Sequence, residues 1–471
     1  MLTLGSHLGL LLPFAGLPWM LALVVRAVRT RSWLHPALFA LVVVSVGATN
    51  ATALFLVGLG PLLWVVFAVV VLREATVTQA VGVVLRIAVL TVGTSLWWIA
   101  GLYCQGAFGI DVLRYTETAR TVAGASTAPE LLRGIGYWFF YGDDKLGPWI
   151  EPSVPYTQNV ALIAGTYGLA GVGLLSAGFV RWRYRGFFVA LVVMGVVAGV
   201  GAHPWADPPL WGRGVKAFLL SDVGLAMRSL PRAVPLLSLG LSVLAGIGIA
   251  AMGAWVRRAA RPLAAGTVAL AVLCLPPLWT GNMVASNLER AEEIPAYWDE
   301  AARYLEGRGR GQGAWSTRVL EVPGADFASY RWGNTVDPIT PGIMDRPVVA
   351  RELIPYGTPL SADLVIALDR QMQEGVLDPA AIAPVARFMG VGDIDLRADL
   401  QYERYNLPVP GSSGPCSGPR PDSARHRGSA APPPTSPIPP YPFRTSRSCR
   451  AARTWPTRPR WRPSRSRTPR P

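Results

Sequence analysis

The chain has 471 residues, of which 51% are hydrophobic and only 15% are charged. Soluble proteins usually carry about 25% charged residues, so this composition excludes an ordinary soluble protein and indicates a membrane protein. The formal net charge of +15 does not indicate nucleic-acid binding, because residues 411–471 alone hold 13 Arg and one acid and the rest is close to neutral.

Eight apolar runs have the composition of membrane-spanning helices, and most approach the ~20 residues that cross a bilayer. They fall at about residues 8–25, 36–48, 52–72, 80–102, 160–180, 187–202, 234–255 and 263–284. The run at 36–48 is short, so together with 52–72 it makes either two crossings or a re-entrant hairpin that turns near Asn50. Two crossings let all eight runs alternate between the two sides of the membrane.

Arginine marks the connections that we expect on the cytoplasmic side, because short cytoplasmic loops collect positive charge. These residues are Arg26, Arg29, Arg31, Arg181, Arg183, Arg185, Arg257, Arg258 and Arg261. The loops at 103–159 and 203–233, together with everything after residue 285, are then predicted to be extracytoplasmic. The N-terminus is predicted to lie outside as well, which favours the hypothesis that Met1 is an internal start of a longer protein.

Three regions follow from the change in composition along the chain. Residues 1–284 are the predicted transmembrane region. Residues 285–410 have the composition of a water-soluble domain and predict an α/β module, with helices near 296–305 and 361–374 and a strand at 318–322. Residues 411–471 are rich in Arg, Pro and Ser, so they are predicted to form a disordered tail, and a frameshift near Pro410 is a hypothesis for its origin.

The two predicted outer loops hold residue types that bind sugars and phosphates. The first loop contributes Glu117, Tyr137 and Trp149, and the second contributes His203, Asp207, Arg228 and Arg232. Aromatic faces suit sugar rings, Arg forks suit phosphate oxygens, and a carboxylate suits a general base, so this set predicts a site for moving a sugar from a lipid-borne phosphate. The aromatic, Arg and His residues also have simpler alternatives: aromatic rings anchor membrane edges, Arg binds lipid headgroups, and His203 caps a span.

No metal site or disulfide framework is visible in the sequence. Cys104, Cys274, Cys416 and Cys449 are scattered, and no group of His, Asp and Glu has a ligand spacing. We therefore name no metal ligand and no cofactor, and leave a divalent-metal requirement open.

Several stretches around these residues resemble the actinobacterial α-(1→3)-arabinofuranosyltransferases of cell-wall arabinan assembly. Two of them are Gly136-Tyr-Trp-Phe-Phe-Tyr141 and Leu146-Gly-Pro-Trp-Ile-Glu-Pro-Ser-Val-Pro-Tyr156, and others lie at 10–18, 95–101, 111–117, 200–204 and 330–333. The similarity extends from near residue 5 to near residue 408. It implies the GT-C fold of polytopic α-helical membrane glycosyltransferases.

The resemblance implies inverting transfer of arabinofuranose from decaprenyl-phosphoryl-arabinofuranose to an arabinan acceptor of arabinogalactan or lipoarabinomannan. The reaction is expected on the outer face of the cytoplasmic membrane, with the lipid-linked donor, the arabinan acceptor and the membrane as partners and no nucleic acid. The residues expected near the donor phosphate or the acceptor are Glu117, His203, Asp207, Arg228 and Arg232. Tyr137 and Trp149 are expected to stack on sugar.

The catalytic base is not assigned. In GT-C enzymes it is an acidic residue in the first outer loop, and this chain is expected to begin after that loop, so it is expected to be an inactive or partial product of such a gene. One alternative is a non-catalytic membrane scaffold in cell-wall assembly. The other is a lipid-linked sugar transporter, which would show repeated halves and ionisable residues at mid-membrane, and the sequence shows neither clearly.

Overall fold

The computed structural model describes residues 8–47, 50–109, 111, 113, 116–291, 293–309, 316–353 and 357–404. The predicted tail at 411–471 lies outside these residues, so its disorder stays a prediction.

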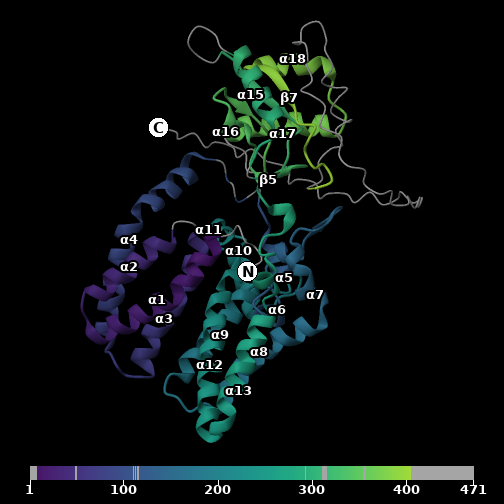
Figure 1. The fold of residues 1–471 in the computed structure, drawn as a ribbon. Helices are drawn as coiled ribbons and strands as arrows, with labels where there is room; N and C mark the ends of the chain where they lie inside the picture. The colour runs from purple at the N-terminus through teal and green to yellow at the C-terminus, as the bar shows by residue number, and fades with distance from the viewer. Residues whose placement is uncertain are drawn as a thin grey trace, which may run out of the picture. The chain divides into compact units, whose positions relative to one another are not determined.

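Eight apolar helices form where the eight apolar runs predict them (Figure 1). They are α1 (Leu8–Thr30), α2 (Leu34–Gly47), α3 (Ala51–Val70), α4 (Val77–Phe108), α8 (Val160–Phe179), α9 (Arg185–Val200), α12 (Val234–Trp255) and α13 (Arg257–Leu273). Helices α1, α3, α4, α8 and α12 are each long and apolar enough to cross a bilayer, while α2, α9 and α13 are shorter apolar helices. The chain is therefore a polytopic α-helical membrane protein.

The last apolar helix ends earlier than the sequence predicts. The predicted run extends to residue 284, whereas α13 ends at Leu273 and a short helix, α14 (Pro276–Thr280), follows it. Leu275 has φ −121° and ψ 55°, outside the helical region, as expected for a residue that precedes proline. Pro276 therefore separates the two helices, and the predicted span is about ten residues too long at its end.

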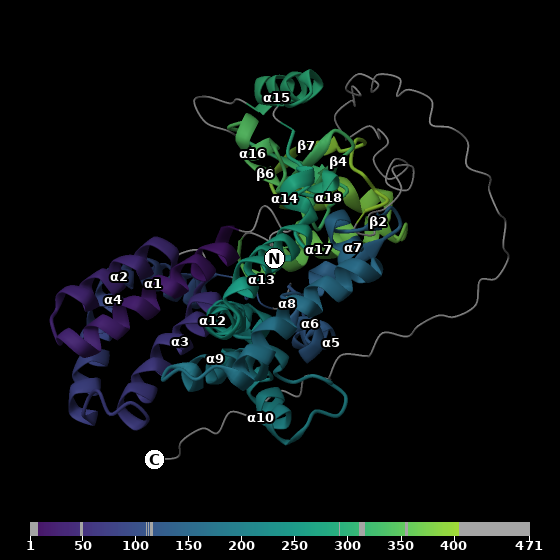
Figure 2. The ribbon, with the colours of Figure 1, turned by 60° about the horizontal axis from the view of Figure 1, so that its bottom comes forward.

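The apolar helices form two groups, α1 to α4 and then α8, α9, α12 and α13, in both ribbon views (Figures 1 and 2).

Small residues let α12 approach its neighbours closely. A Cβ atom on Gly195 of α9 would lie 2.7 Å from the backbone N of Leu237, and one on Gly240 would lie 2.6 Å from a methyl group of Val192. Such close approach is how helices associate in lipid, where no hydrophobic effect drives them together.

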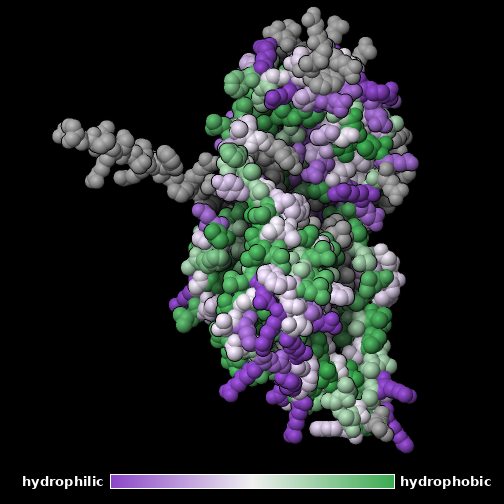
Figure 3. All heavy atoms as spheres, turned by 90° about the vertical axis from the view of Figure 1, so that its left-hand side faces the viewer, coloured by the Kyte–Doolittle hydropathy of each residue, from purple (hydrophilic) through white to green (hydrophobic). Residues whose placement is uncertain are grey.

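Arginine-bearing connections meet at one end of the helices, which we call the arginine end. Arg29 Nε and Arg183 Nη2 lie 3.2 and 2.6 Å from the two carboxylate oxygens of Glu74. Arg86, inside α4, donates to the carbonyl of Arg31 over 2.6 Å, so its long side chain reaches this end from within the helix. Figure 3 shows hydrophilic side chains gathered below a mostly hydrophobic helical region.

The opposite end, which we call the loop end, joins the α2–α3 turn to the loop before α12. Arg232 Nη1 donates to Asn50 Oδ1 over 3.0 Å, and Thr52 Oγ1 donates to the carbonyl of Ala226 over 2.9 Å. Because this turn lies at the loop end and Arg31 and Glu74 lie at the arginine end, α2 and α3 run between the two ends. This arrangement favours two crossings over the re-entrant hairpin.

An α/β region follows the last apolar helix. Its three-stranded parallel sheet has the order β6-β3-β7, with β3 in the middle. The elements are α15 (Ala296–Gly309), β3 (Arg318–Val322), β4 (Ala328–Tyr330), β5 (Gly333–Val336), α16 (Thr340–Ile343), β6 (Val348–Val349), α17 (Pro359–Gln373), α18 (Pro379–Phe388) and β7 (Val391–Leu396). The helices expected at 296–305 and 361–374 and the strand at 318–322 are present, whereas the module's bounds at 285 and 410 stay a prediction.

Candidate functional site

Two loops come together at the loop end. The first lies between α4 and α8 and holds α5 (Ala119–Ala125), α6 (Ala128–Leu132), η3 (Trp138–Tyr141), the hairpin β1 (Asp143–Asp144) and β2 (Gly147–Pro148), η4 (Glu151–Ser153) and α7 (Val154–Gln158). The second lies between α9 and α12 and holds α10 (Leu210–Leu219), α11 (Asp222–Ala226) and η5 (Leu230–Ala233). Four of the seven predicted site residues interact with one another where these loops meet.

Arg228 and Glu117 form an enclosed ion pair between the two loops. Arg228 Nη2 lies 3.5 Å from Glu117 Oε2, and the two side chains are only 7% and 12% exposed. Arg228 Nε donates to the Glu117 carbonyl over 2.7 Å, Nη1 donates to the Leu225 carbonyl over 2.9 Å, and Nη2 donates to Thr116 Oγ1. All three guanidinium nitrogens are therefore engaged, so Arg228 fixes the backbone just before α5.

Glu117 is held from a second direction. Ser229 Oγ donates to Glu117 Oε1 over 2.9 Å, while Arg228 approaches the other oxygen. One Glu117 oxygen thus accepts a hydrogen bond and the other faces a guanidinium, so both oxygens bind groups of the second loop. The geometry makes Glu117 a positioning residue for the two loops.

Arg232 differs from Arg228 because part of its guanidinium is free. Its Nη1 donates to Asn50 Oδ1 over 3.0 Å, but its buried Nε has no hydrogen-bond partner. Buried donors are normally paired, so an orphan guanidinium nitrogen beside a loop is a candidate contact for an anion. This residue is the strongest candidate for a phosphate ligand among the predicted site residues.

Tyr137 lies close enough to Glu117, Arg228 and Arg232 for their charges to act on its hydroxyl. Its ring is buried, and that burial raises the pKa of its hydroxyl, while the nearby Arg232 partly opposes the rise and Glu117 adds to it. The phenol therefore stays protonated and able to donate a hydrogen bond at neutral pH. Tyr137, Glu117, Arg228 and Arg232 together make up what we call the loop-end cluster.

His203 anchors the helix that begins just after Glu117. Its Nδ1 lies 2.8 Å from the carbonyl oxygen of Ala123, in α5. A carbonyl can only accept a hydrogen bond, so Nδ1 carries the proton in this contact, and in the neutral ring Nε2 keeps its lone pair. His203 thus supports the loop-end cluster from the second loop and leaves one nitrogen as a hydrogen-bond acceptor.

The structure places Trp149 and Asp207 differently. Trp149 packs edge-on against Trp138, with ring centres 5.9 Å apart, and belongs to an aromatic cluster that also contains Tyr137. The Asp207 side chain is 89% exposed and lies 3.5 Å from Arg213. Trp149 therefore supports the wall behind Tyr137, whereas Asp207 lies on the surface.

Sequence reasoning missed several partners of this site. The sequence places Asn50 near a turn, and the structure shows that it also caps α3 by accepting from the backbone N of Ala53 and accepts from Arg232. Ser229 and Thr116 were not singled out, although each is adjacent in sequence to a predicted residue. Adjacency to Arg228 and Glu117 was the one available signal for them.

The α/β region is tied to the first loop by a second enclosed ion pair. Arg404 Nη1 lies 3.0 and 2.9 Å from the two oxygens of Asp144, at the tip of the β1–β2 hairpin. Asn287, in η6 (Ser286–Leu288), donates from Nδ2 to the Trp149 carbonyl over 3.1 Å. The Asp144 carboxylate is therefore a docking contact between the hairpin and the α/β region.

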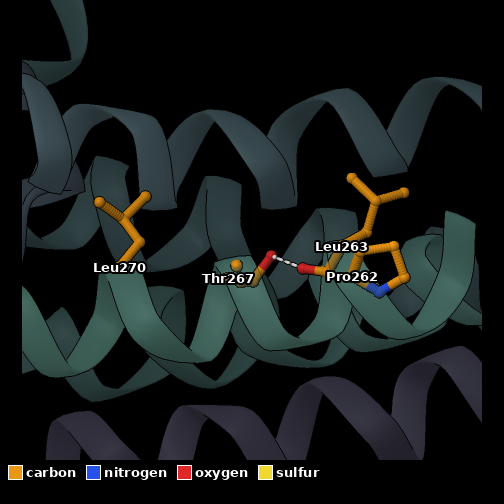
Figure 4. A pocket seen from close by; sticks show the side chains of 5 residues that line it. Pro262, Leu263, Thr267 and Leu270 are labelled. Carbon is orange, nitrogen blue, oxygen red and sulfur yellow. Dashed lines mark hydrogen bonds between the residues drawn. The ribbon is translucent and has the colours of Figure 1, made fainter.

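No group of three or more His, Cys, Asp and Glu side chains is placed to hold a metal ion within the described ranges. Two grooves open on the apolar helices instead. One, of about 430 Å³, is lined along α13 by Pro262, Leu263, Gly266, Thr267 and Leu270 (Figure 4). The other, of about 610 Å³, lies between α2 and α4 and includes Leu41 and Trp97. Their linings are mainly apolar, so they suit hydrocarbon chains rather than a sugar.

Comparisons with known proteins agree with this architecture. A sequence profile described as "Alpha-(1->3)-arabinofuranosyltransferase, N-terminal GT-C domain" matches residues 1–413. An α-(1→3)-arabinofuranosyltransferase of Mycobacterium tuberculosis is 29% identical over 428 residues, which cover 85% of this chain and 29% of that protein. One of Mycolicibacterium smegmatis is 28% identical over 325 residues, which cover 64% of this chain and 22% of that protein. The chain thus spans less than a third of the curated relatives it matches.

Solved structures show the same fold. The cryo-EM structure of arabinofuranosyltransferase AftD from mycobacteria superposes with a TM-score of 0.62 at 21% identity, over 87% of this chain and 26% of that one. A mutant of the same enzyme, in its second class, gives a TM-score of 0.60 at 21% identity, over 86% of this chain and 27% of that one.

Proposed function

The chain belongs to the family of N-terminal GT-C domains of α-(1→3)-arabinofuranosyltransferases, and from this premise we propose that it is the membrane-embedded part of a polyprenyl-phosphate-dependent arabinofuranosyltransferase. Its donor is decaprenyl-phosphoryl-arabinofuranose and its acceptor is a cell-wall arabinan. The curated relatives are named α-(1→3)-arabinofuranosyltransferases. The donor and acceptor rest on the residue types at the loop end and on the resemblance of the sequence.

The proposed location is the cytoplasmic membrane, with the loop end outside. The positive-inside tendency supports this orientation, because Arg29 and Arg183 share Glu74 at the opposite end. The first loop, the second loop and the α/β region that docks on Asp144 are then extracytoplasmic. A donor whose sugar is carried on a membrane lipid would present its phosphate at this boundary.

One observation carries the proposal: Arg232 keeps an unpaired, buried Nε beside Tyr137 and the loop-end cluster. A polyprenyl phosphate becomes the leaving group when the acceptor hydroxyl oxygen bonds to the anomeric carbon, the bond from that carbon to the phosphate oxygen breaks, and the hydroxyl proton passes to a general base. Arg232 would stabilise the phosphate charge, and the protonated Tyr137 hydroxyl would donate to a phosphate or sugar oxygen. Arg228, Glu117 and His203 would hold these two residues in place.

The proposal assigns no catalytic base to the described residues. Glu117 is engaged by Ser229 and Arg228, and the Asp207 side chain is exposed beside Arg213. The His203 Nε2 would accept a hydrogen bond from an acceptor hydroxyl, while its Nδ1 donates to the Ala123 carbonyl and keeps the residue in its positioning role. Asp207 is left outside the donor site, and Trp149 contributes through the aromatic wall that it forms with Trp138.

The test measures binding of decaprenyl phosphate to the whole chain in nanodiscs, by microscale thermophoresis. A charge-assisted hydrogen bond contributes roughly 1.5–3 kcal/mol, so Arg232→Gln should weaken binding about 10-fold or more. Arg213→Gln is the matched control, because Arg213 also belongs to the second loop but its side chain is 67% exposed. Equal affinities of Arg232→Gln and the unmutated chain would contradict the proposed donor site.

A transfer assay separates an enzyme from a scaffold. The whole chain, supplied with decaprenyl-phosphoryl-arabinofuranose and a synthetic arabinan acceptor, would release decaprenyl phosphate and lengthen the acceptor if it is active alone. Binding that depends on Arg232 without any turnover would instead fit a partial enzyme that needs further sequence. Absence of both binding and turnover would favour the non-catalytic scaffold.

A further inference from the structure

Helix α10 (Leu210–Leu219), in the second loop, presents large apolar side chains that no described part of the protein covers. Leu210, Trp211 and Phe218 are 86%, 62% and 46% exposed. At 100° per residue these three side chains project from one side of the helix, and we call this side the apolar flank. Leu220 and Val223, just beyond the helix, are each 71% exposed.

The side of α10 that packs on the protein fixes the level of this helix relative to the ends of the apolar helices. Leu219 is buried against Ala119 and Ala202, and Val215 and Leu230 pack on the same small cluster. Ala202 lies two residues beyond the end of α9, and Leu230 begins the 3-10 helix that leads directly into α12. Helix α10 is therefore attached at the level where two apolar helices end, and it lies at the edge of the helical region in Figure 2.

The remaining side of α10 carries its charges. Arg213 and Lys216 project away from the apolar flank at the helical angle. Lys216 Nζ donates to the Trp205 carbonyl over 2.7 Å and lies 4.9 Å from the centre of that indole ring. Arg213 Nε donates to the Pro208 carbonyl over 3.2 Å. One helix thus has a side on the protein, a cationic side and an exposed apolar flank.

The length of α9 determines what surrounds this helix. Its 16 residues extend about 24 Å at 1.5 Å per residue, less than the ~30 Å thickness of a bilayer's hydrocarbon core. Arg181, Arg183 and Arg185 lie at its other end, where long basic side chains reach the headgroups. The end of α9 at Val200 then lies no higher than the boundary between acyl chains and headgroups, and the segment that follows starts within that boundary layer.

We infer that α10 lies in the plane of the membrane surface at the loop end, with its apolar flank among the outer acyl chains and Arg213 among the headgroups. The partner is the lipid surface itself. Helix α9 also presents apolar side chains to its surroundings, since Val193 and Val197 are 55% and 41% exposed. A Trp at the edge of the hydrocarbon and basic residues on the polar side are typical of helices that lie in an interface.

This inference rests on the membrane fold and not on the proposed transfer reaction. Its consequence concerns the loop-end cluster, because α10 connects through α11 to Arg228 and Ser229. A helix held in the headgroup layer would fix the height of that cluster relative to the lipid phosphates. The depth of α10 can be measured whether or not the chain transfers sugar.

The test is site-directed spin labelling of the whole chain in nanodiscs. In a background with Cys104→Ser, Cys274→Ala, Cys416→Ser and Cys449→Ser, single cysteines replace Leu210, Trp211, Phe218 or Arg213. Accessibility to oxygen, which concentrates in acyl chains, is compared with accessibility to a water-soluble nickel chelate. Val193→Cys gives the lipid-facing reference and Asp207→Cys gives the water-facing reference.

The expected result is an oxygen-to-nickel accessibility ratio at Leu210, Trp211 and Phe218 several-fold above that at Arg213 and close to the Val193 reference. The three positions are independent, so a variant that does not fold leaves the other two as tests. Nickel accessibility equal to the Asp207 reference would show that the flank faces water, and this would overturn the inference. Low accessibility to both reagents would overturn it as well, because a second copy or another protein segment would then cover the flank.

Discussion

The two ends of the apolar helices use the same residue types in different surroundings. At the arginine end, Glu74 pairs with Arg29 and Arg183, whose side chains are 47% and 56% exposed. At the loop end, Glu117 pairs with Arg228, and the two are only 12% and 7% exposed. Both sites join connections that are distant in sequence, but only the loop-end cluster excludes water.

The degree of exposure determines how much each ion pair contributes to stability. Exposed ion pairs contribute about 0–1 kcal/mol, because water screens them and the side chains lose entropy when they pair. Breaking an enclosed pair costs about 3–5 kcal/mol, because the remaining charge is left without a partner or water. The charges at the arginine end can therefore set the orientation of the chain in the membrane by their number. The stability of the loop-end cluster, in contrast, depends on each of its individual contacts.

The largest expected effect comes from Arg228→Met. The substitution leaves the Glu117 carboxylate and carbonyl without the guanidinium, so we expect a loss of about 3–5 kcal/mol in the free energy of unfolding. Thermal unfolding can be followed through the buried Cys274 thiol with a thiol-reactive dye, in a Cys104→Ser, Cys416→Ser, Cys449→Ser background.

The control for that experiment is the double variant Arg228→Met, Glu117→Gln. Removing the charge of the partner should recover part of the loss, and the double-mutant cycle should show a coupling of about 1 kcal/mol or more. Strictly additive effects of the two substitutions would mean that the pair does not stabilise the meeting of the two loops.

A third pair, Glu321 with Arg397 in the α/β region, is also enclosed and makes stability depend on pH. Burial raises the pKa of Glu321 to about 7 even though Arg397 lies 3.2 Å away and opposes the rise. A raised folded-state pKa gives stability that is complete below the unfolded value near 4.5 and is lost as pH rises through about 7.

The expected result is a free energy of unfolding that falls with pH over this window, by on the order of 3 kcal/mol from Glu321. Glu321→Gln should flatten the fall. Hydrogen exchange of β3 and β7, corrected for intrinsic rates, measures it. Burial also raises the pKa of Asp395, to about 6. Asp395 titrates in the unmutated protein and in Glu321→Gln alike, so the difference between their two stability profiles against pH isolates the contribution of Glu321. Parallel profiles would contradict the assignment.

Arg404→Gln tests the contact between the α/β region and the first loop, with an intermediate effect. The variant loses a nearly enclosed pair with Asp144, so we expect the β1–β2 hairpin to open about 10-fold more often, equivalent to roughly 1.5 kcal/mol. Hydrogen exchange at residues 143–148 measures this opening. Arg331→Gln, which breaks a more exposed pair with Glu403, is the control and should leave the hairpin unchanged.

The smallest expected effect belongs to the arginine end. Arg183→Gln removes one of two partners of Glu74 at an exposed site, so the free energy of unfolding should change by less than about 1 kcal/mol. The dye assay on Cys274 applies again. A loss as large as that of Arg228→Met would erase the distinction between the two ends.

The sequence is sufficient to predict the helices because the length and apolarity of a span are local properties. It also predicts that Arg29 and Arg183 share one side, since the positive-inside tendency acts on each connection separately. The predicted end of the last apolar run, at residue 284, was wrong because hydropathy does not include the backbone restriction that Pro276 imposes on Leu275.

The loop-end cluster could be predicted only in part. The prediction that both loops are extracytoplasmic brings Glu117, Tyr137, Arg228 and Arg232 to the same side of the membrane. It does not say which of these residues touch. The pairing of Glu117 with Arg228 joins residues 111 apart in sequence and depends on how α5 packs beside η5. The roles of Asn50 and Asp144 depend on partners 182 and 260 residues away, so no local pattern reveals them.

In the proposed orientation, the loop-end cluster faces the cell exterior and the arginine end faces the cytoplasm. Two variants test it directly, Asp207→Cys at the loop end and Arg183→Cys at the arginine end, both highly exposed positions. In the Cys104→Ser, Cys416→Ser, Cys449→Ser background, a membrane-impermeant maleimide should label Cys at 207 on intact cells and Cys at 183 only after permeabilisation. Labelling in the opposite pattern would place the cluster in the cytoplasm and contradict the proposed transfer at the outer face.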